Sequence, residues 1–216
     1  MVRELLIIGT SGLAHEVAQL ARQIDPKCER WDQVSFVANN ADELGKSSTY
    51  GSVRYLDSDL TSRQLSSDVV IGIGHPKMRR KVAERLQDIT SLSFPNLIHP
   101  TVLIDESCVN IGRGNMITIG VVMTCDITIG DFNLVNWNVT IGHDTSIGSY
   151  NVLNPGSNVS GWVSIGDACL LGTGCQILEN RSVANEITVG AGAVVTRSLL
   201  STGATYVGIP ARQVAC

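Results

Sequence analysis

Residues 129–148 read IGDFNLVNWNVTIGHDTSIG, and an aliphatic residue occupies every sixth position of this stretch, beginning at Ile129. The same phase continues in both directions without a break, over 85 residues from Ile111 to Val195. Gly follows at seven of the fifteen positions, and Asn, Thr or Ser follows at most of the others. The fifteen are Ile111, Ile117, Met123, Ile129, Val135, Ile141, Ile147, Leu153, Val159, Ile165, Leu171, Ile177, Val183, Val189 and Val195. An irregular β-sandwich would not keep one six-residue phase over this length.

This period predicts a coil with flat sides. One aliphatic side chain points inward on each side, and the small or polar residue after it tolerates the bend at a corner. A six-residue unit cannot bury its apolar side chain alone, so stacked coils must share one continuous core. With three sides to a coil, eighteen residues return the chain to the same corner one level higher. The region from Pro100 onward is therefore predicted to be an all-β parallel β-helix of about five coils.

The first part of the chain follows a different pattern, in which short strands and helices alternate. A Gly-rich turn, Gly9-Thr10-Ser11-Gly12, follows the first apolar run and precedes an amphipathic stretch. This order predicts a βαβ fold, a small Rossmann-like parallel sheet. The predicted strands are 5–8, 34–37 and 68–73, and the predicted helices are 14–24 and 77–86. The change near Phe94-Pro95 predicts two domains, an α/β domain over 1–95 and the β-helix over 96–216.

The composition excludes several classes of protein. Hydrophobic residues make up 44% of the 216 residues, which is enough for a core, while aromatics are only 5%. The net charge of −4, without a basic run, argues against a nucleic-acid partner. The apolar run Leu5–Ile8 is too short for a signal peptide or membrane insertion. The six cysteines (28, 108, 125, 169, 175 and 216) show no CxxC pair and no zinc spacing, so we expect reduced thiols, no metal and a cytoplasmic location.

Several short motifs, together with the repeat, resemble the hexapeptide-repeat sugar acetyltransferases related to sialic acid O-acetyltransferase and to bacillosamine and perosamine N-acetyltransferases. The resemblance covers almost the whole chain and implies a left-handed β-helix and a homotrimer. It also implies acetyl-CoA as co-substrate in the cleft between neighbouring β-helices, and a nucleotide-linked sugar held by the N-terminal domain. The motifs are Gly9-Thr10-Ser11-Gly12 with Glu16-Val17, Ile71-Gly72-Ile73-Gly74 with Arg79, Asn96 to Pro100, Asn136 with Gly142-His143-Asp144, Asn154-Pro155-Gly156, and Val207 to Ala211.

Acetyl transfer needs a base for the acceptor, a donor for the developing oxyanion and a means of holding both substrates. His143 is the only histidine in the periodic region, and it follows a corner glycine, so its side chain is expected to point outward. The resemblance implies that His143 is the base and that Asp144 orients it. It also implies that Asn136, seven residues earlier and at a corner position that we take as equivalent, contacts the reacting groups. Plain corner roles for Asn136 and Asp144 stay open.

The eighteen-residue step from one coil to the next identifies candidate residues for contacts with the cofactor. Gly161 lies one coil above His143, where its N–H is a candidate oxyanion donor, and Thr173 and Ala191 are candidates for backbone contacts to CoA. The N–H groups of the Gly-rich turn suit a phosphate. The expected substrate cleft at the carboxyl ends of the strands is lined by Gly9, Ser11, Gly12, His15, Gly74 and His75, although His15 and His75 are equally consistent with surface residues. His99-Pro100 is expected to have a structural role at the start of the β-helix.

Two departures from the family pattern bear on specificity. Ala38-Asn39-Asn40 stands where many members have two acidic residues after the second strand, and Val152 replaces a second histidine nine residues after the base. We expect an N-acetyltransferase for a nucleotide-linked amino sugar of surface glycans, with O-acetylation of a sialic acid or another sugar hydroxyl as the alternative. A β-helix carbonic anhydrase would need three zinc-binding histidines in the repeat, and a non-catalytic solenoid would not need the His143-Asp144 pair. The sequence names neither the sugar nor the nucleotide.

Overall fold

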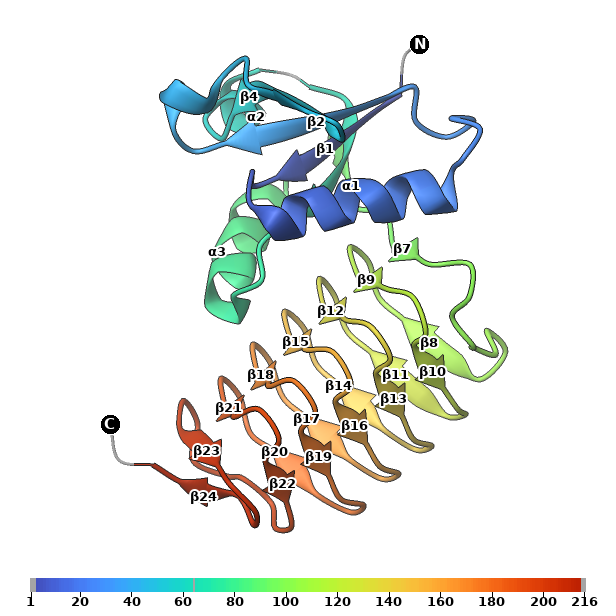
Figure 1. Ribbon diagram of the computed structural model, residues 1–216, viewed down its shortest axis with the longest axis vertical. Helices are drawn as coiled ribbons and strands as arrows, with labels where there is room; N and C mark the ends of the chain where they lie inside the picture. Colours follow the sequence, from blue (N-terminus) through green and yellow to red (C-terminus); the bar gives the residue numbers. More distant parts are fainter. Residues whose placement is uncertain (1–2, 64, 215–216) are drawn as a thin grey trace.

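A computed structural model describes residues 3–63 and 65–214, and Cys216 lies outside them. The chain has two parts: an N-terminal region built on one sheet, and a stack of short coils that ends near the C-terminus (Figure 1). The chain passes from the first part to the second between β6 (Leu92–Ser93) and β7 (Leu97–Ile98), since β6 pairs in the N-terminal sheet and β7 in the β-helix.

The N-terminal region is a six-stranded sheet in the order β3-β4-β2-β1-β5-β6, parallel except for the hairpin pair β3–β4. The three predicted strands and two predicted helices are present with slightly different ends. The hairpin was not predicted, because β4 is rich in polar residues and buries only Val53 fully. The elements are β1 (Glu4–Ile8), α1 (Gly12–Ile24), β2 (Gln33–Ala38), a 3₁₀ turn (Ala41–Glu43), β3 (Ser47–Ser48), β4 (Gly51–Leu56), α2 (Asp59–Ser62), β5 (Ser67–Ile71) and α3 (Pro76–Leu86).

The second part is a left-handed parallel β-helix with three sheets, and from β8 to β22 each strand pairs with the strand eighteen residues away. The predicted length of one coil is therefore confirmed. The sheet that faces the N-terminal region, called sheet I here, contains β7, β9 (Met116–Ile117), β12 (Leu134–Val135), β15 (Val152–Leu153), β18 (Leu170–Leu171), β21 (Thr188–Val189), β23 (Thr205–Val207) and β24 (Arg212–Gln213). Sheet II contains β10 (Val122–Met123), β13 (Thr140–Ile141), β16 (Asn158–Val159), β19 (Gln176–Ile177) and β22 (Val194–Val195). Sheet III contains β8 (Val109–Ile111), β11 (Ile127–Ile129), β14 (Ser146–Ile147), β17 (Ser164–Ile165) and β20 (Ser182–Val183).

The periodic aliphatic side chains form the inner core of the coils, and nearly all of them are buried. The residue before each of them points outward, and its character differs between sheets. On sheet I it is apolar in four successive coils, Met116, Leu134, Val152 and Leu170, and the first three pack with α1 in one buried cluster. On sheet III the same positions hold Thr or Ser and are exposed from β11 to β20. The apolar outer face of sheet I therefore fixes the N-terminal region over that side of the prism.

A buried arginine ties the two parts together. Arg79 of α3 is fully buried, and its guanidinium donates to the carbonyl oxygens of Ile71 (2.8 Å), Ile73 (2.9 Å) and Phe132 (3.1 Å). Ile71 ends β5, whereas Phe132 belongs to the turn before β12 of the β-helix. Burial lowers the pKa of Arg79 to about 9, so the side chain remains charged at neutral pH. Because the charge contacts only carbonyls, α3, β5 and this turn must keep their relative positions.

Candidate active site

His143 lies at the corner between β13 of sheet II and β14 of sheet III. Its side chain points outward, as the corner position predicts, and is 44% exposed. Its Nδ1 lies 2.8 Å from Oδ2 of Asp144. Asp144 has a φ of 55°, a left-handed conformation that Asp tolerates better than most residues and that lets its carboxylate turn back to the neighbouring ring. An N–H on Nδ1 that donates to Asp144 leaves the lone pair of Nε2 free, which is the state that a base requires.

The next coil closes over the imidazole. The Cα of Gly161 packs against the ring so closely that a Cβ there would lie 2.7 Å from both Cε1 and Nε2 of His143. Trp162 follows, with its ring centroid 4.4 Å from that of His143 in an edge-to-face arrangement, and its backbone N–H donates to the carbonyl of His143 (2.9 Å). The imidazole is therefore held on three sides, by a carboxylate, a glycine and an indole.

Three predicted cofactor contacts have unused backbone donors. Within the described residues, the N–H groups of Gly161, Thr173 and Ala191 make no hydrogen bond. At the corner between sheets III and I, by contrast, the N–H of Ser149 is capped by the side chain of Asp167. Gly161 stands at the His143 corner, one coil higher, whereas Thr173 and Ala191 stand at the corner between sheets I and II. Thr173 and Ala191 are eighteen residues apart and form one column of free donors, which suits an extended ligand that carries carbonyl and phosphate oxygens.

Asn136 is not at the same corner as His143. It directly follows the inward Val135, between β12 and β13, so the position in phase with His143 is Trp137 rather than Asn136. The expected equivalence of the two positions is thus wrong by one residue. Asn136 is 9% exposed, and its Oδ1 accepts the backbone N–H of Trp137 at 3.1 Å. In the described chain no hydrogen bond joins it to His143.

The His143 corner lies on the side of the prism away from the N-terminal region. The N-terminal region covers sheet I, and His143 lies where sheets II and III meet, which is the corner opposite sheet I in a three-sided prism (Figure 1). The base and any ligand held by the N-terminal region of the same chain are therefore on opposite sides of the β-helix.

The N-terminal region has a cavity of about 470 Å³ at the carboxyl ends of its central strands, called the sheet-edge cavity here. It is lined by the predicted Gly9, Ser11, Gly74 and His75, together with Asn39. Gly9 has a φ of 112°, and a Cβ there would lie 3.0 Å from the carbonyl oxygen of Gly72, so the turn requires glycine. Ser11 and His75 are the N-caps of α1 and α3, and neither uses its side chain to cap its helix.

The charges on this cavity favour an anion. Lys81 and Arg85 line it, with Asp57 as the lining carboxylate. Asp57 pairs with Arg85 through both of its oxygens, and this hydrogen bond raises the pKa of Arg85. Lys81 has no ion-pair partner among the described residues. One uncompensated lysine beside the N-termini of two helices suits the diphosphate of a nucleotide.

Two other predicted substrate residues are placed differently. His15 lines a separate cavity of about 200 Å³ on the other side of Thr10, where its ring stacks on Tyr50 at 5.5 Å and meets the edge of Phe36 at 5.3 Å. Gly12 begins α1 and does not line the sheet-edge cavity. A Cβ at Gly12 would contact nothing within 4 Å, so nothing in the packing requires glycine there.

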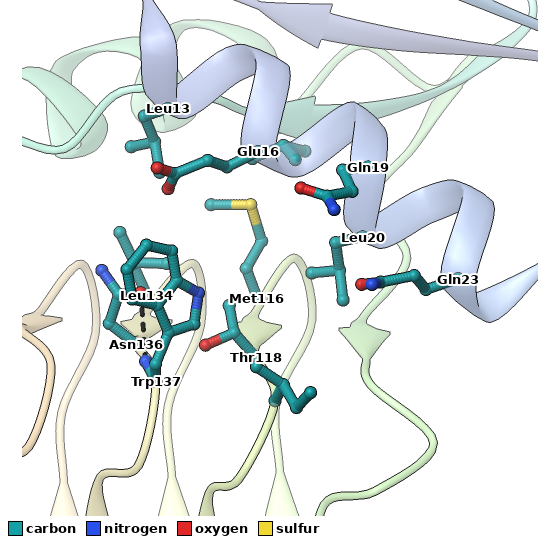
Figure 2. Close-up of a pocket in the computed structure, with 12 residues that line it drawn as sticks. Leu13, Glu16, Gln19, Leu20, Gln23, Met116, Thr118, Leu134, Asn136 and Trp137 are labelled. Atoms are coloured by element: carbon teal, nitrogen blue, oxygen red, sulfur yellow. Dashed lines mark hydrogen bonds between the residues drawn. The ribbon is translucent and has the colours of Figure 1, made fainter. Parts of the chain in front are cut away.

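A further cavity of about 240 Å³, called the α1 cavity here, lies between α1 and the first coils of the β-helix (Figure 2). Its apolar lining includes Leu13, Met116 and Leu134. The remaining lining includes Glu16, Gln19, Gln23, Thr118, Asn136 and Trp137. Asn136 thus lines a cavity under the N-terminal region of its own chain, away from its own His143.

Two classes of feature are not found among residues 3–63 and 65–214. No three His, Cys, Asp or Glu side chains gather in a way that could hold a metal ion. The helices of these residues are also too short or too polar to cross a bilayer.

Comparison with known proteins agrees with this geometry. Residues 4–86 match the family described as PglD N-terminal domain. The N-terminal region is therefore similar to the PglD N-terminal domain. No curated protein matches the chain in sequence.

Solved structures match the PglD-like chain over its whole length. The acetyltransferase domain of PglB from Neisseria gonorrhoeae FA1090, in complex with acetyl coenzyme A, is 26% identical, with a TM-score of 0.89 over 99% of this chain and 100% of that one. Perosamine N-acetyltransferase from Caulobacter crescentus, a variant bound to CoA and GDP-perosamine, is 28% identical, with a TM-score of 0.88 over 100% and 99%. WeeI from Acinetobacter baumannii AYE is 28% identical, with a TM-score of 0.86 over 99% and 100%. The resemblance to hexapeptide-repeat sugar acetyltransferases is thereby confirmed.

Several residues at these sites were not predicted from the sequence. The eighteen-residue step could have identified Trp162 as a neighbour of the base, because Trp162 follows Gly161 and stands one coil above Asp144. Lys81 and Arg85 lie in the predicted helix 77–86. Their place on the sheet-edge cavity depends on where α3 packs, and the sequence pattern does not show that.

Proposed function

We propose that this PglD-like chain transfers acetyl from acetyl-CoA to the amine of a nucleotide-linked amino sugar for surface glycans. The observation that carries the proposal is the outward imidazole of His143. It pairs with Asp144, and Gly161, whose N–H is free, packs against its ring from the next coil. The solved structures similar over the whole chain, which include a sugar N-acetyltransferase bound to CoA and GDP-perosamine, support it. No feature of the site favours O-acetylation.

Each residue has a defined role in the transfer. Nε2 of His143 takes the proton from the acceptor nitrogen as that nitrogen attacks the thioester carbonyl carbon. Asp144 holds the ring through Nδ1 and stabilises the imidazolium that forms. The N–H of Gly161 donates to the oxyanion. The new C–N bond replaces the C–S bond, and CoA leaves as a thiol after its sulfur receives a proton.

The complete site requires two copies of the chain. One copy provides His143, Asp144 and Gly161, and its neighbour provides the bound acceptor, because these lie on opposite sides of one β-helix. Asn136 of the neighbour contacts the reacting groups in this arrangement, and Thr173 and Ala191 offer their free N–H groups to CoA in the shared groove. Closed cyclic symmetry repeats the same groove at every interface, and we propose a homotrimer.

In this proposal the two parts of the chain bind different substrates. Residues 1–95 hold the nucleotide, with Gly9, Ser11, Gly74 and His75 around the diphosphate and Lys81 providing charge. Gly12 contributes a free N–H in the first turn of α1, and His15 borders the neighbouring cavity. Residues 96–216 bind acetyl-CoA and carry out the transfer. We place the reaction in the cytoplasm, where acetyl-CoA and nucleotide sugars are available and the five described cysteines remain reduced.

Release of CoA tests the proposed function. The purified chain is incubated with acetyl-CoA and with UDP-, GDP- and dTDP-linked amino sugars, and free thiol is measured. We expect release with at least one of these acceptors and none with the corresponding free sugars. Equal release with a free sialic acid would support O-acetylation instead. No release with any acceptor, together with no stabilisation by acetyl-CoA, would contradict an enzymatic role.

A further inference from the structure

The α1 cavity contains polar groups that the protein itself does not use. Within residues 3–63 and 65–214, Glu16 makes no ion pair or hydrogen bond, and the amides of Gln19 and Gln23 have no partner. Asn136 uses its Oδ1 on the backbone N–H of Trp137, which leaves its Nδ2 without an acceptor. These groups lie along α1 and on the coil below it, and they face a shared space (Figure 2). Glu16, Gln19 and Gln23 are exposed, so water satisfies them, and a polar ligand in this cavity can take the place of that water.

The remaining surface of this cavity is apolar and partly aromatic. Met116 and Leu134 are buried at its floor, whereas the indole of Trp137 is 40% exposed. An exposed indole beside a carboxylate favours a ligand that has both C–H faces and a positive charge, because the ring face and the carboxylate each attract a cation. A protonated amino sugar has both properties.

The two cavities carry opposite charge. Glu16 is the only charged residue lining the α1 cavity, whereas the sheet-edge cavity has Lys81 and the paired Arg85 and Asp57. A nucleotide-linked amino sugar is anionic at its diphosphate and cationic at its amine. The charge of such a ligand therefore matches the two cavities when its sugar lies under α1.

A single ligand can reach both cavities because they meet at the start of α1. Leu13 lines the α1 cavity, and a Cβ on Gly74 of the sheet-edge cavity would lie only 3.3 Å from Cδ2 of Leu13. Ser11, two residues before Leu13, lines the sheet-edge cavity. The diphosphate and the sugar would thus lie on either side of the first turn of α1.

We propose that the α1 cavity binds the amine-bearing sugar of the acceptor, with Glu16 holding the ammonium and Trp137 packing against the C–H face of the ring. This role rests on the proposed function. It concerns binding only, since the ammonium must lose a proton before its nitrogen attacks the thioester. Because an ammonium forms a charge pair with Glu16 whereas a sugar hydroxyl forms only a hydrogen bond to it, the cavity favours amines over hydroxyls.

Equilibrium binding separates the sugar from the nucleotide. The ligands are the best acceptor of the UDP-, GDP- and dTDP-linked amino sugars, its bare nucleoside diphosphate, and the same nucleotide with a sugar that has a hydroxyl in place of the amine. We expect E16Q and W137A each to weaken binding of the amino-sugar nucleotide at least about 10-fold, within the range for a partly desolvated cation–π or charge contact. Binding of the nucleoside diphosphate and of acetyl-CoA should change less than about 2-fold. E16Q should weaken binding of the hydroxyl analogue much less than binding of the amino-sugar nucleotide.

The controls distinguish failure of this inference from failure of the proposed function. Glu29→Gln removes an exposed carboxylate from the same region and should bind all ligands like the wild type. If W137A is poorly folded, W137F preserves a ring, and E16Q alone remains decisive because it changes charge without changing shape. Equal losses for the nucleoside diphosphate and the amino-sugar nucleotide, or no loss in either variant, would overturn the inference. A wild-type chain that releases no CoA with any amino sugar would instead overturn the proposed function.

Discussion

Replacing His143 with Ala is expected to lower kcat by about 10²-fold or more, the usual range for loss of a general base. The variant should fold like the wild type, since the side chain is 44% exposed and the corner around it is held by backbone hydrogen bonds. Its affinity for the nucleotide sugar should be nearly unchanged, because the N-terminal region of the neighbouring copy holds the nucleotide and the imidazole contacts only the reacting amine. Steady-state kinetics of CoA release checks both expectations.

Cys125→Ala is the matched control. Cys125 occupies the same corner one coil below His143, and its backbone carbonyl, which the substitution retains, accepts the N–H of Asp144. Turnover of this variant should stay within about 2-fold of the wild type, as for most exposed substitutions. A H143A enzyme that keeps turnover within a few-fold of the wild type would show that another group acts as the base.

Adding one methyl group at Gly161 should lower kcat by about 10²-fold as well, by moving the base. A Cβ at this position would lie 2.7 Å from Cε1 and Nε2 of His143, closer than atoms pack, so the imidazole must rotate away. The backbone at Gly161 is not left-handed, so Ala adds no conformational strain there. The melting temperature of G161A should therefore stay near that of the wild type while kcat falls.

A double variant distinguishes displacement of the base from other effects of Gly161→Ala. Once His143 is Ala, the space above residue 143 is free and the added methyl group has nothing to displace. G161A in the H143A background should then cost less than about 2-fold in kcat, and the two effects should be strongly non-additive. A further loss as large as that of G161A alone would mean that residue 161 acts independently of the imidazole, for example on the oxyanion donor itself.

The repeat made the β-helix predictable from the sequence. One inward aliphatic residue for each six-residue side leaves few other folds, and the eighteen-residue step correctly placed Gly161 over His143. The sequence also encodes the side of the prism on which the N-terminal region docks. The residue before the inward aliphatic is apolar at Met116, Leu134 and Val152, eighteen residues apart, whereas on sheet III the same step gives Thr and Ser. The same packing shows that Val152 is buried against the N-terminal region.

The grouping of the side chains into sites was harder to predict. Asn136 and His143 are seven residues apart, and only the coil geometry shows that β13 separates them onto different corners. Likewise, His15 and Ser11 are close in sequence, but α1 turns His15 toward Phe36 and Tyr50. Corner and helix positions within a few residues of one another face different directions, so neighbouring sequence positions alone could not assign residues to one cavity.

Mixed oligomers test most directly whether one copy acts on the ligand of another. One chain carries His143→Ala and lacks the base, and the other carries Ser11→Trp, which fills the sheet-edge cavity, where the native Ser11 side chain makes no cap bond. Each variant alone should be nearly inactive. If each site takes its base from one chain and its acceptor from the next, equal mixing by co-expression should restore about one quarter of the wild-type activity for each chain, since half of the bases and half of the cavities are intact. Activity that stays at the level of the separate variants in verified mixed oligomers would contradict a site shared between copies.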